Sequence, residues 1–193
     1  MIAAALRLGP LLLASRSPQR RAILAQLGIE FEVVHSGYDE LPMTDAEPAQ
    51  VARAHAAGKA GAVSAQALGR PVLGVDTVVA VDGHALGKPA DAGEARRFLE
   101  SLAGREHEVH SGLCLVAGSR PYERLATTRV RFRALAAEDV EWYLASGEWR
   151  ERAGGYAIQG RGGALVAGID GDYTNVVGLP VAALLDAMGE AVR

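Results

Sequence analysis

The stretch Leu11-Leu-Leu-Ala-Ser-Arg-Ser-Pro-Gln-Arg20 joins a short apolar run to a helix start. Its first four residues predict a buried strand. Ser17 is a favoured N-cap residue and Pro18 suits the first helical position, so a helix is expected to begin there. A strand that passes through a short loop into a helix is typical of α/β proteins.

The rest of the chain continues this mixture of strands and helices. Further strands are expected at 31–34, 72–81, about 107–117 and about 123–133, and helices at about 48–68, about 91–103, about 137–146 and after Pro180. Ser36 to Pro42 is expected to form a polar loop, and Asp82-Gly83 a hairpin turn. Because strands and helices do not alternate strictly, we predict an α/β fold with a mixed sheet. The length fits one domain over residues 1–193 better than two independent domains.

The bulk composition restricts the classes of function. Hydrophobic residues make up 49% of the 193 residues, which is enough to form a core. The formal net charge of -3 argues against a nucleic-acid-binding protein. The longest apolar stretches are too short for a membrane span, and Arg7 and Pro10 interrupt the apolar N-terminus. The single cysteine, Cys114, lies in an apolar run and predicts a buried thiol in a reducing compartment. A cytoplasmic protein without nucleic-acid or membrane partners is therefore expected.

The first segment with chemical character is the loop between the opening strand and helix. Ser15, Arg16, Ser17, Arg20 and Arg21 gather near a helix N-terminus, whose free N–H groups favour anions. Hydroxyls, amides and forked guanidinium groups together suit phosphate oxygens. A capped helix beside solvated arginines explains the same pattern, and the stretch is not a P-loop because it lacks that motif.

The second segment is Val75-Asp-Thr-Val-Val79, which carries a carboxylate inside a β-branched strand. Such a group is excluded from a core unless it is paired, binds a metal or takes part in catalysis, although an exposed strand end also accommodates it. Lys88, beyond the expected hairpin, is placed to return beside Asp76. Asp39 and Glu40 follow the second strand and, taken alone, are ordinary loop acids. Together with Asp76 they would offer the oxygen ligands that Mg²⁺ prefers.

The third segment is the glycine-rich stretch Ala153 to Gly163. Glycines permit close approach of the backbone to a ligand, and Gln159 has both a donor and an acceptor with which to read a base edge. Glycine turns between strands explain the stretch nearly as well. His107 and His110 do not form a metal motif, because residues three apart on a strand face opposite sides.

These segments occur in the order, and nearly the spacing, of the motifs of the Maf family, which the chain resembles over almost its whole length. The matching stretches are Leu13 to Arg20, Asp39-Glu40, Lys59-Ala60, Asp76 to Val79, Lys88-Pro89, Leu102 to Gly104, Ala153 to Gly160 and Gly171 to Pro180. The resemblance implies a mixed α/β fold similar to that of ITP/XTP pyrophosphatases, with two lobes around a central cleft, and a homodimer.

The implied reaction is the attack of water on the α-phosphorus of a nucleoside triphosphate, which releases the monophosphate and pyrophosphate. A divalent cation, Mg²⁺ or Mn²⁺, is implied as cofactor. By this resemblance Asp76 is the general base or the activator of the water, and Glu40 and Asp76 are the metal ligands. Ser15, Arg20, Lys59 and Lys88 are expected to bind and neutralise the triphosphate.

The resemblance also bears on base specificity. Thr77 and Gln159 resemble the Maf group that acts on dTTP and UTP, so these nucleotides are expected as substrates. Gln19 departs from the pattern, because that group usually carries arginine there, and the glutamine brings no charge. The alternatives are a pyrophosphatase for another base, such as 7-methyl-GTP or ITP, and a nucleotide-binding regulator of septum formation.

Overall fold

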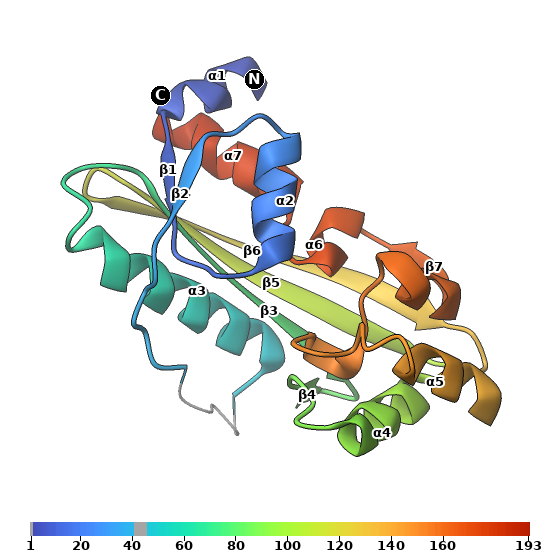
Figure 1. Ribbon diagram of the computed structural model, residues 1–193. Coiled ribbons are helices and arrows are strands. Elements are labelled where there is room, and N and C mark those ends of the chain that lie inside the picture. Colours follow the sequence, from blue (N-terminus) through green and yellow to red (C-terminus); the bar gives the residue numbers. More distant parts are fainter. Residues whose placement is uncertain (1, 41–45) are drawn as a thin grey trace.

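The computed structural model describes residues 2–40 and 46–193 and contains a mixed seven-stranded sheet (Figure 1). The strand order is β2-β1-β3-β5-β6-β7, with β4 paired to the outer part of β3. The strands are β1 (Leu11–Leu13), β2 (Phe31–Val33), β3 (Val72–Val81), β4 (His84–Leu86), β5 (Glu106–Ala117), β6 (Arg120–Phe132) and β7 (Val166–Asp170). β1 runs parallel to β2 and β3, and the other pairs are antiparallel. The predicted mixed α/β fold is confirmed.

Helices cover both faces of this sheet (Figure 1). The α-helices are α1 (Ile2–Ala5), α2 (Pro18–Gln26), α3 (Pro48–Ser64), α4 (Ala92–Leu102), α5 (Ala137–Leu144), α6 (Tyr173–Val177) and α7 (Val181–Ala191); the 3₁₀ helices are η1 (Leu6–Leu8), η2 (Ala153–Gly155) and η3 (Gly160–Leu165). α3 lies alone along one face, while α2, α6 and α7 lie over the other. None of the described helices has the length and apolar character needed to cross a membrane.

Several predicted helix boundaries are confirmed by their capping bonds. The Ser17 hydroxyl accepts a hydrogen bond from the Arg20 amide at the start of α2, and Asp91 accepts one from the Glu94 amide at the start of α4. α3 ends four residues earlier than expected, because Leu68 and the residues around it turn the chain. β6 begins at Arg120 and not at residue 123, and α6 was not predicted. The end of the loop expected at Ser36 to Pro42 lies outside the described residues.

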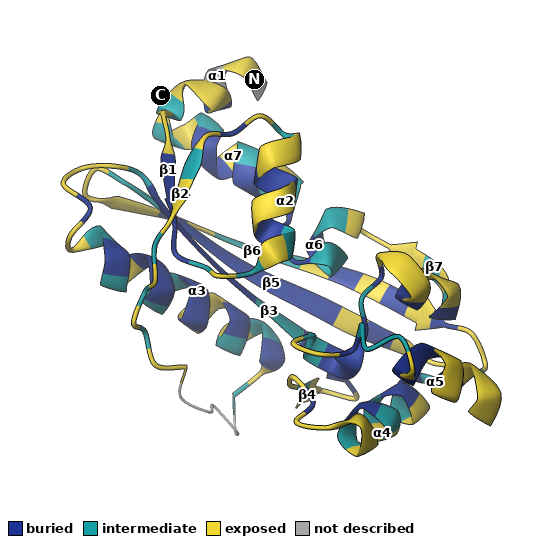
Figure 2. Cartoon of the chain, viewed as in Figure 1, coloured by how far each residue is buried: buried dark blue, intermediate teal, exposed yellow. Residues whose placement is uncertain are grey.

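One face of the sheet carries two separate apolar clusters. Leu73 and Val75 belong to the cluster beneath α2 and α7, and Val79 and Val81 to the cluster beneath α4 and α5. All four side chains point to the same face because they alternate along β3. Thr77, between the two clusters, is the polar member of this row and is half-buried, while the strand is buried before it and again from Val79 onward. Figure 2 shows β3 mostly in the colour of buried residues. The two clusters therefore form two lobes with a polar strip between them.

On the opposite face, α3 packs directly against the backbone of the sheet. A β carbon added at Gly74 would lie 2.2 Å from the carbonyl oxygen of Ala56, and one at Gly112 would lie 2.2 Å from that of Ala52. Real β carbons do not approach backbone atoms so closely, so both positions require glycine. This contact fixes the height of α3 above β3.

The edge of β3 is open where the two lobes meet. β1 pairs only with Val72 and Leu73, and β4 pairs only with residues 79–81. In the described part of the chain, no strand pairs with this edge of β3 between Gly74 and Val78. The loop that follows β1 and the loop that follows β4 face each other across this gap.

Candidate active site

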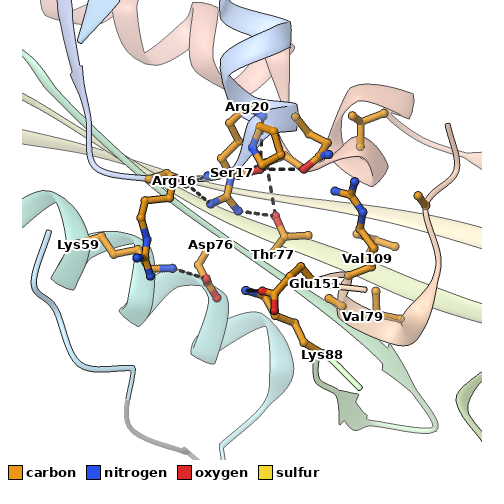
Figure 3. Close-up of a pocket in the computed structure, with 18 of the residues that line it drawn as sticks. Arg16, Ser17, Arg20, Lys59, Asp76, Thr77, Val79, Lys88, Val109 and Glu151 are labelled. Carbon is orange, nitrogen blue, oxygen red and sulfur yellow. Dashed lines mark hydrogen bonds and ion pairs between the residues drawn. The ribbon is translucent and has the colours of Figure 1, made fainter. Parts of the chain in front are cut away.

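A cleft of about 630 Å³ opens at the gap beside β3 (Figure 3). The residues that the resemblance assigns to the site all line this cleft: Ser15, Gln19, Arg20, Glu40, Lys59, Asp76, Thr77, Lys88 and Gln159. These residues come from the loop after β1, the start of α2, the loop after β2, α3, β3, the end of β4 and the glycine-rich stretch. Arg21 and Asp39, which the sequence also singled out, are not among the residues that line it. The structure therefore brings together most of the predicted positions, with Arg21 and Asp39 as the exceptions.

Asp76 is buried and bound to a lysine. Its carboxylate accepts a hydrogen bond of 2.6 Å from Nζ of Lys59, and the Asp76 residue is 8% exposed. Glu40 reaches the same ammonium group from the loop after β2, at 2.7 Å. Partial burial by itself raises the pKa of Glu40, but the hydrogen bond and charge of Lys59 outweigh it, so the pKa is lower than usual. Two carboxylates thus converge on one cationic position.

The close packing of α3 explains why Lys59 meets Asp76. Asp76 has the same side-chain direction as Gly74, so it points toward α3. Lys59 lies on the helix segment that Gly74 contacts at Ala56 and Ala60. Thr77, the next residue, points to the other face of the sheet.

Arg20 connects the loop after β1, strand β3 and the end of α6 at the floor of the cleft. Its Nε donates to the carbonyl oxygen of Gly178 (2.8 Å), one terminal nitrogen donates to Ser15 Oγ (2.9 Å), and the other donates to Thr77 Oγ1 (3.1 Å). Thr77 also shares a hydrogen bond of 2.9 Å with Ser111. Burial lowers the pKa of Arg20, and the charges of Asp76 and Glu40 oppose that shift. An arginine in this position keeps its charge and places a positive field at the floor of the cleft.

Lys88 reaches the cleft from the end of β4, but its ammonium group pairs with Glu151 at 3.1 Å. The expectation that Lys88 returns beside Asp76 is met only in that both line the same cleft, because Lys59 is the cation bound to Asp76. Glu151 adopts a left-handed backbone conformation (φ 58°), which is uncommon for a residue with a side chain. The turn at this residue therefore holds a carboxylate opposite Lys88.

The two glutamines lie at the rim of the cleft. Gln159 is exposed, and Gln19 is half-buried at the first turn of α2. The Ser17 hydroxyl donates to Oε1 of Gln19 at 3.2 Å, which leaves the amide N–H groups of Gln19 available as donors. Both side chains are therefore available to a ligand in the cleft.

Among the cleft residues that were not singled out from the sequence are Tyr38, Arg150 and Arg152. Nε of Arg152 is buried and has no hydrogen-bond partner among the residues that the structure describes. Such a donor is costly in an unliganded site and is satisfied when an acceptor binds. In the sequence, Arg150 and Arg152 could have been recognised as candidate site residues because they form a charged run with Glu151 directly before the glycine-rich stretch.

The residues that the sequence analysis set aside lie in the core. His107 contacts Phe132 and Tyr156 edge-on, while His110 lies 2.9 Å from Thr127, so the two histidines have different surroundings. Cys114 is buried, as predicted, and burial with the nearby charge of Glu123 raises its pKa to about 11. This thiol is protonated at neutral pH and chemically inert.

The donor set at the centre of the cleft fits a divalent cation. No group of three or more His, Cys, Asp or Glu side chains that could hold a metal occurs within residues 2–40 and 46–193. Glu40 and Asp76 already converge on a single positive charge, and Mg²⁺ commonly takes one or two carboxylates together with water and substrate phosphates. The two carboxylates therefore suit an ion that arrives with phosphate ligands.

A family model described as Maf-like protein matches residues 10–191. The chain belongs to the Maf family. A protein of Symbiobacterium thermophilum named dTTP/UTP pyrophosphatase is 47% identical over 171 residues, covering 89% of this chain and 88% of the relative. Maf relatives with the same name from Myxococcus xanthus and Pyrococcus furiosus are 48% and 40% identical, covering 93% and 91% of this chain and 92% of each relative.

Among solved structures, a HAM1 protein from Coxiella burnetii aligns with this Maf chain at 16% identity and a TM-score of 0.46. The alignment covers 81% of this chain and 91% of that protein.

Proposed function

We propose that the chain hydrolyses nucleoside triphosphates, with dTTP and UTP preferred, to the monophosphate and pyrophosphate. The observation that carries this proposal is Asp76, a buried carboxylate beside Lys59 in a cleft rich in cationic and hydroxyl groups. Relatives with 40–48% identity over nearly the whole chain bear the name dTTP/UTP pyrophosphatase. Both kinds of observation support the same reaction class.

Asp76 is the proposed general base. It accepts a proton from a water molecule that attacks the α-phosphorus, and the bond from that phosphorus to the bridging oxygen of the pyrophosphate breaks. The bond from Lys59 holds the carboxylate in a fixed orientation, as a general base requires. Asp76 lies on a central strand and Lys59 on a helix packed against it, so the pair is held in position before substrate binds.

The triphosphate needs cations, and the cleft provides two kinds: lysines that are paired with carboxylates and an arginine with a buried donor. Lys59 and Lys88 are paired with carboxylates in the free protein, and the phosphates would replace Glu151 as the partner of Lys88. Arg152 has a buried donor that finds no partner within the described part of the chain, and we add it to the proposed phosphate ligands. Arginine binds phosphate oxygens through paired N–H groups. Ser15 and Arg20 complete the set on the opposite side of the cleft.

Glu40 and Asp76 would hold the divalent cation, Mg²⁺ or Mn²⁺. When bound, the ion would neutralise charge on the phosphate oxygens. Lys59 lies between these carboxylates, and its ammonium group would turn toward the phosphates when the ion is bound.

Base selection is proposed to involve Thr77, Gln19 and Gln159 at the rim and floor of the cleft. The amide N–H groups of Gln19 are donors that match the carbonyl oxygens of uracil and thymine. Gln159 supplies both a donor and an acceptor. As in the resemblance, a cytoplasmic homodimer is the proposed form, and light scattering of the purified protein tests the dimer.

The test is a panel of canonical and modified nucleoside triphosphates with Mg²⁺, in which pyrophosphate and orthophosphate are measured separately. Pyrophosphate with UTP and dTTP as the best substrates is expected, and Asp76→Asn should lower kcat by ~10²–10⁴-fold. Release of orthophosphate instead would mean cleavage at the γ-phosphate. A folded Asp76→Asn protein with wild-type turnover would exclude Asp76 as the base.

A further inference from the structure

The ring of Tyr38 lies directly on the bare α carbon of Gly58 in α3. A β carbon added at Gly58 would lie 2.2 Å from Cε2 and 2.4 Å from Cζ of Tyr38. A glycine inside a helix is destabilising relative to alanine, so this position costs helix stability unless another contact needs it. Gly61, one turn later in the same helix, has no atom within 4 Å of an added β carbon. Gly58 therefore differs from Gly61 in supporting an aromatic ring.

The hydroxyl end of Tyr38 is bound to the same helix. Its Oη lies 3.2 Å from Nδ1 of His55, and the two rings meet edge-on with centroids 5.8 Å apart. His55 is 6% exposed and lies one turn before Lys59, so both side chains belong to one side of α3. Tyr38 is thus held at its ring by Gly58 and at its hydroxyl by His55.

This attachment lies two residues before Glu40. The Glu40 side chain is 52% exposed and bonds to Lys59 at 2.7 Å. A half-exposed glutamate on a loop gains little from a single ion pair, because ordering its side chain opposes the attraction. Tyr38 removes much of this freedom by fixing the loop on α3, the helix that also carries Lys59.

We propose that Tyr38, Gly58 and His55 are positioning residues that hold Glu40 over Lys59. They fix the second carboxylate of the cation site opposite Asp76. The inference rests on the proposed function in one respect, since it takes Glu40 as a ligand of the divalent cation. It adds that the geometry of this ligand is set by the contact of Tyr38 with α3 and not by Glu40 itself.

The test measures Mn²⁺ affinity by electron paramagnetic resonance in the presence of α,β-methylene-UTP, which the enzyme does not cleave, together with kcat and KM for UTP. Gly58→Ala displaces the Tyr38 ring and should weaken Mn²⁺ binding by ~10-fold, the usual effect of losing an outer partner of a metal ligand. Tyr38→Phe keeps the ring and loses only the hydroxyl bond, so a change of about threefold is expected. Gly61→Ala, the matched control on the same helix, should leave both readouts unchanged.

A double-mutant cycle separates positioning from general damage to the fold. In a Glu40→Gln background, Gly58→Ala should have no further effect on Mn²⁺ affinity, because the ligand that it positions is absent. An additive effect would overturn the proposal, and so would wild-type Mn²⁺ affinity in both Gly58→Ala and Tyr38→Phe. If Glu40→Gln alone leaves Mn²⁺ affinity unchanged, the assignment of Glu40 fails instead, and with it this part of the proposed function.

Discussion

Replacing Gly74 by alanine should separate α3 from the sheet and open the site. The new β carbon would lie 2.2 Å from the carbonyl oxygen of Ala56 and 2.7 Å from the amide nitrogen of Ala60, and both are backbone atoms that no side-chain rotation can remove. Ordinary contacts begin near 3.4 Å, so α3 must move away by about 1 Å.

The magnitude follows from what this movement does to the buried pair. Overpacking of this kind costs ~1–3 kcal/mol of the free energy of unfolding. Lys59 moves with α3, so its 2.6 Å bond to Asp76 lengthens to about 3.6 Å, beyond the ~3.2 Å limit of a hydrogen bond. A displacement of about 1 Å at a catalytic group typically lowers the rate by ~10²-fold. We therefore expect a loss of ~1–3 kcal/mol in the free energy of unfolding and a ~10²-fold loss in kcat.

Urea unfolding followed by tryptophan fluorescence, together with kcat for UTP, measures both effects. Gly61→Ala is the matched control, because its β carbon meets nothing within 4 Å. It should stabilise the protein by up to ~1 kcal/mol through helix propensity and leave kcat unchanged. The reasoning is refuted if Gly74→Ala is as stable as the wild type and turns over UTP at the same rate.

Three more predictions follow from the site and its surroundings. Burial lowers the pKa of His107 to about 4, so below pH 6.5 the unfolded chain binds a proton that the folded chain does not. The free energy of unfolding should therefore fall by about 3 kcal/mol as the pH is lowered from 6.5 to 4. In urea unfolding, the free energy of unfolding of His107→Gln should depend less on pH than that of the wild type. Arg152→Gln should raise KM for UTP by ~10-fold, whereas Arg161→Gln, outside the cleft, should not; equal KM values would remove Arg152 from the phosphate ligands. Arg20→Lys, which keeps the charge but not the three-way hydrogen bonding, should lose both stability and kcat in the same assays, and wild-type values for both would contradict the structural role of Arg20.

The sequence predicted those features that depend on neighbours in the chain. The cap at Ser17 and the pattern of β3 are local, and Asp76 was conspicuous because a carboxylate does not belong in a β-branched strand without a partner. The partner itself was not predictable. Lys59 meets Asp76 because Gly74 lets α3 approach, and that packing is a property of the assembled layers.

Two other features escaped the sequence for the same physical reason. The bond from Arg20 to Gly178 joins residues 158 positions apart, and no spacing rule reports such a contact. The support of Glu40 by Tyr38 depends on which side of α3 the loop crosses, which residues 36–40 do not encode by themselves.

The three-way bonding of Arg20 has a consequence for the order in which the molecule is made. A ribosome that has released residues up to β7 has already provided Lys59 and Asp76, but not Gly178, whose carbonyl oxygen is the acceptor for Nε of Arg20. Contacts between distant segments form late in folding because the intervening chain must first be ordered. The floor of the cleft is therefore completed only after Gly178 has been synthesised, so the two walls of the site can form before its floor.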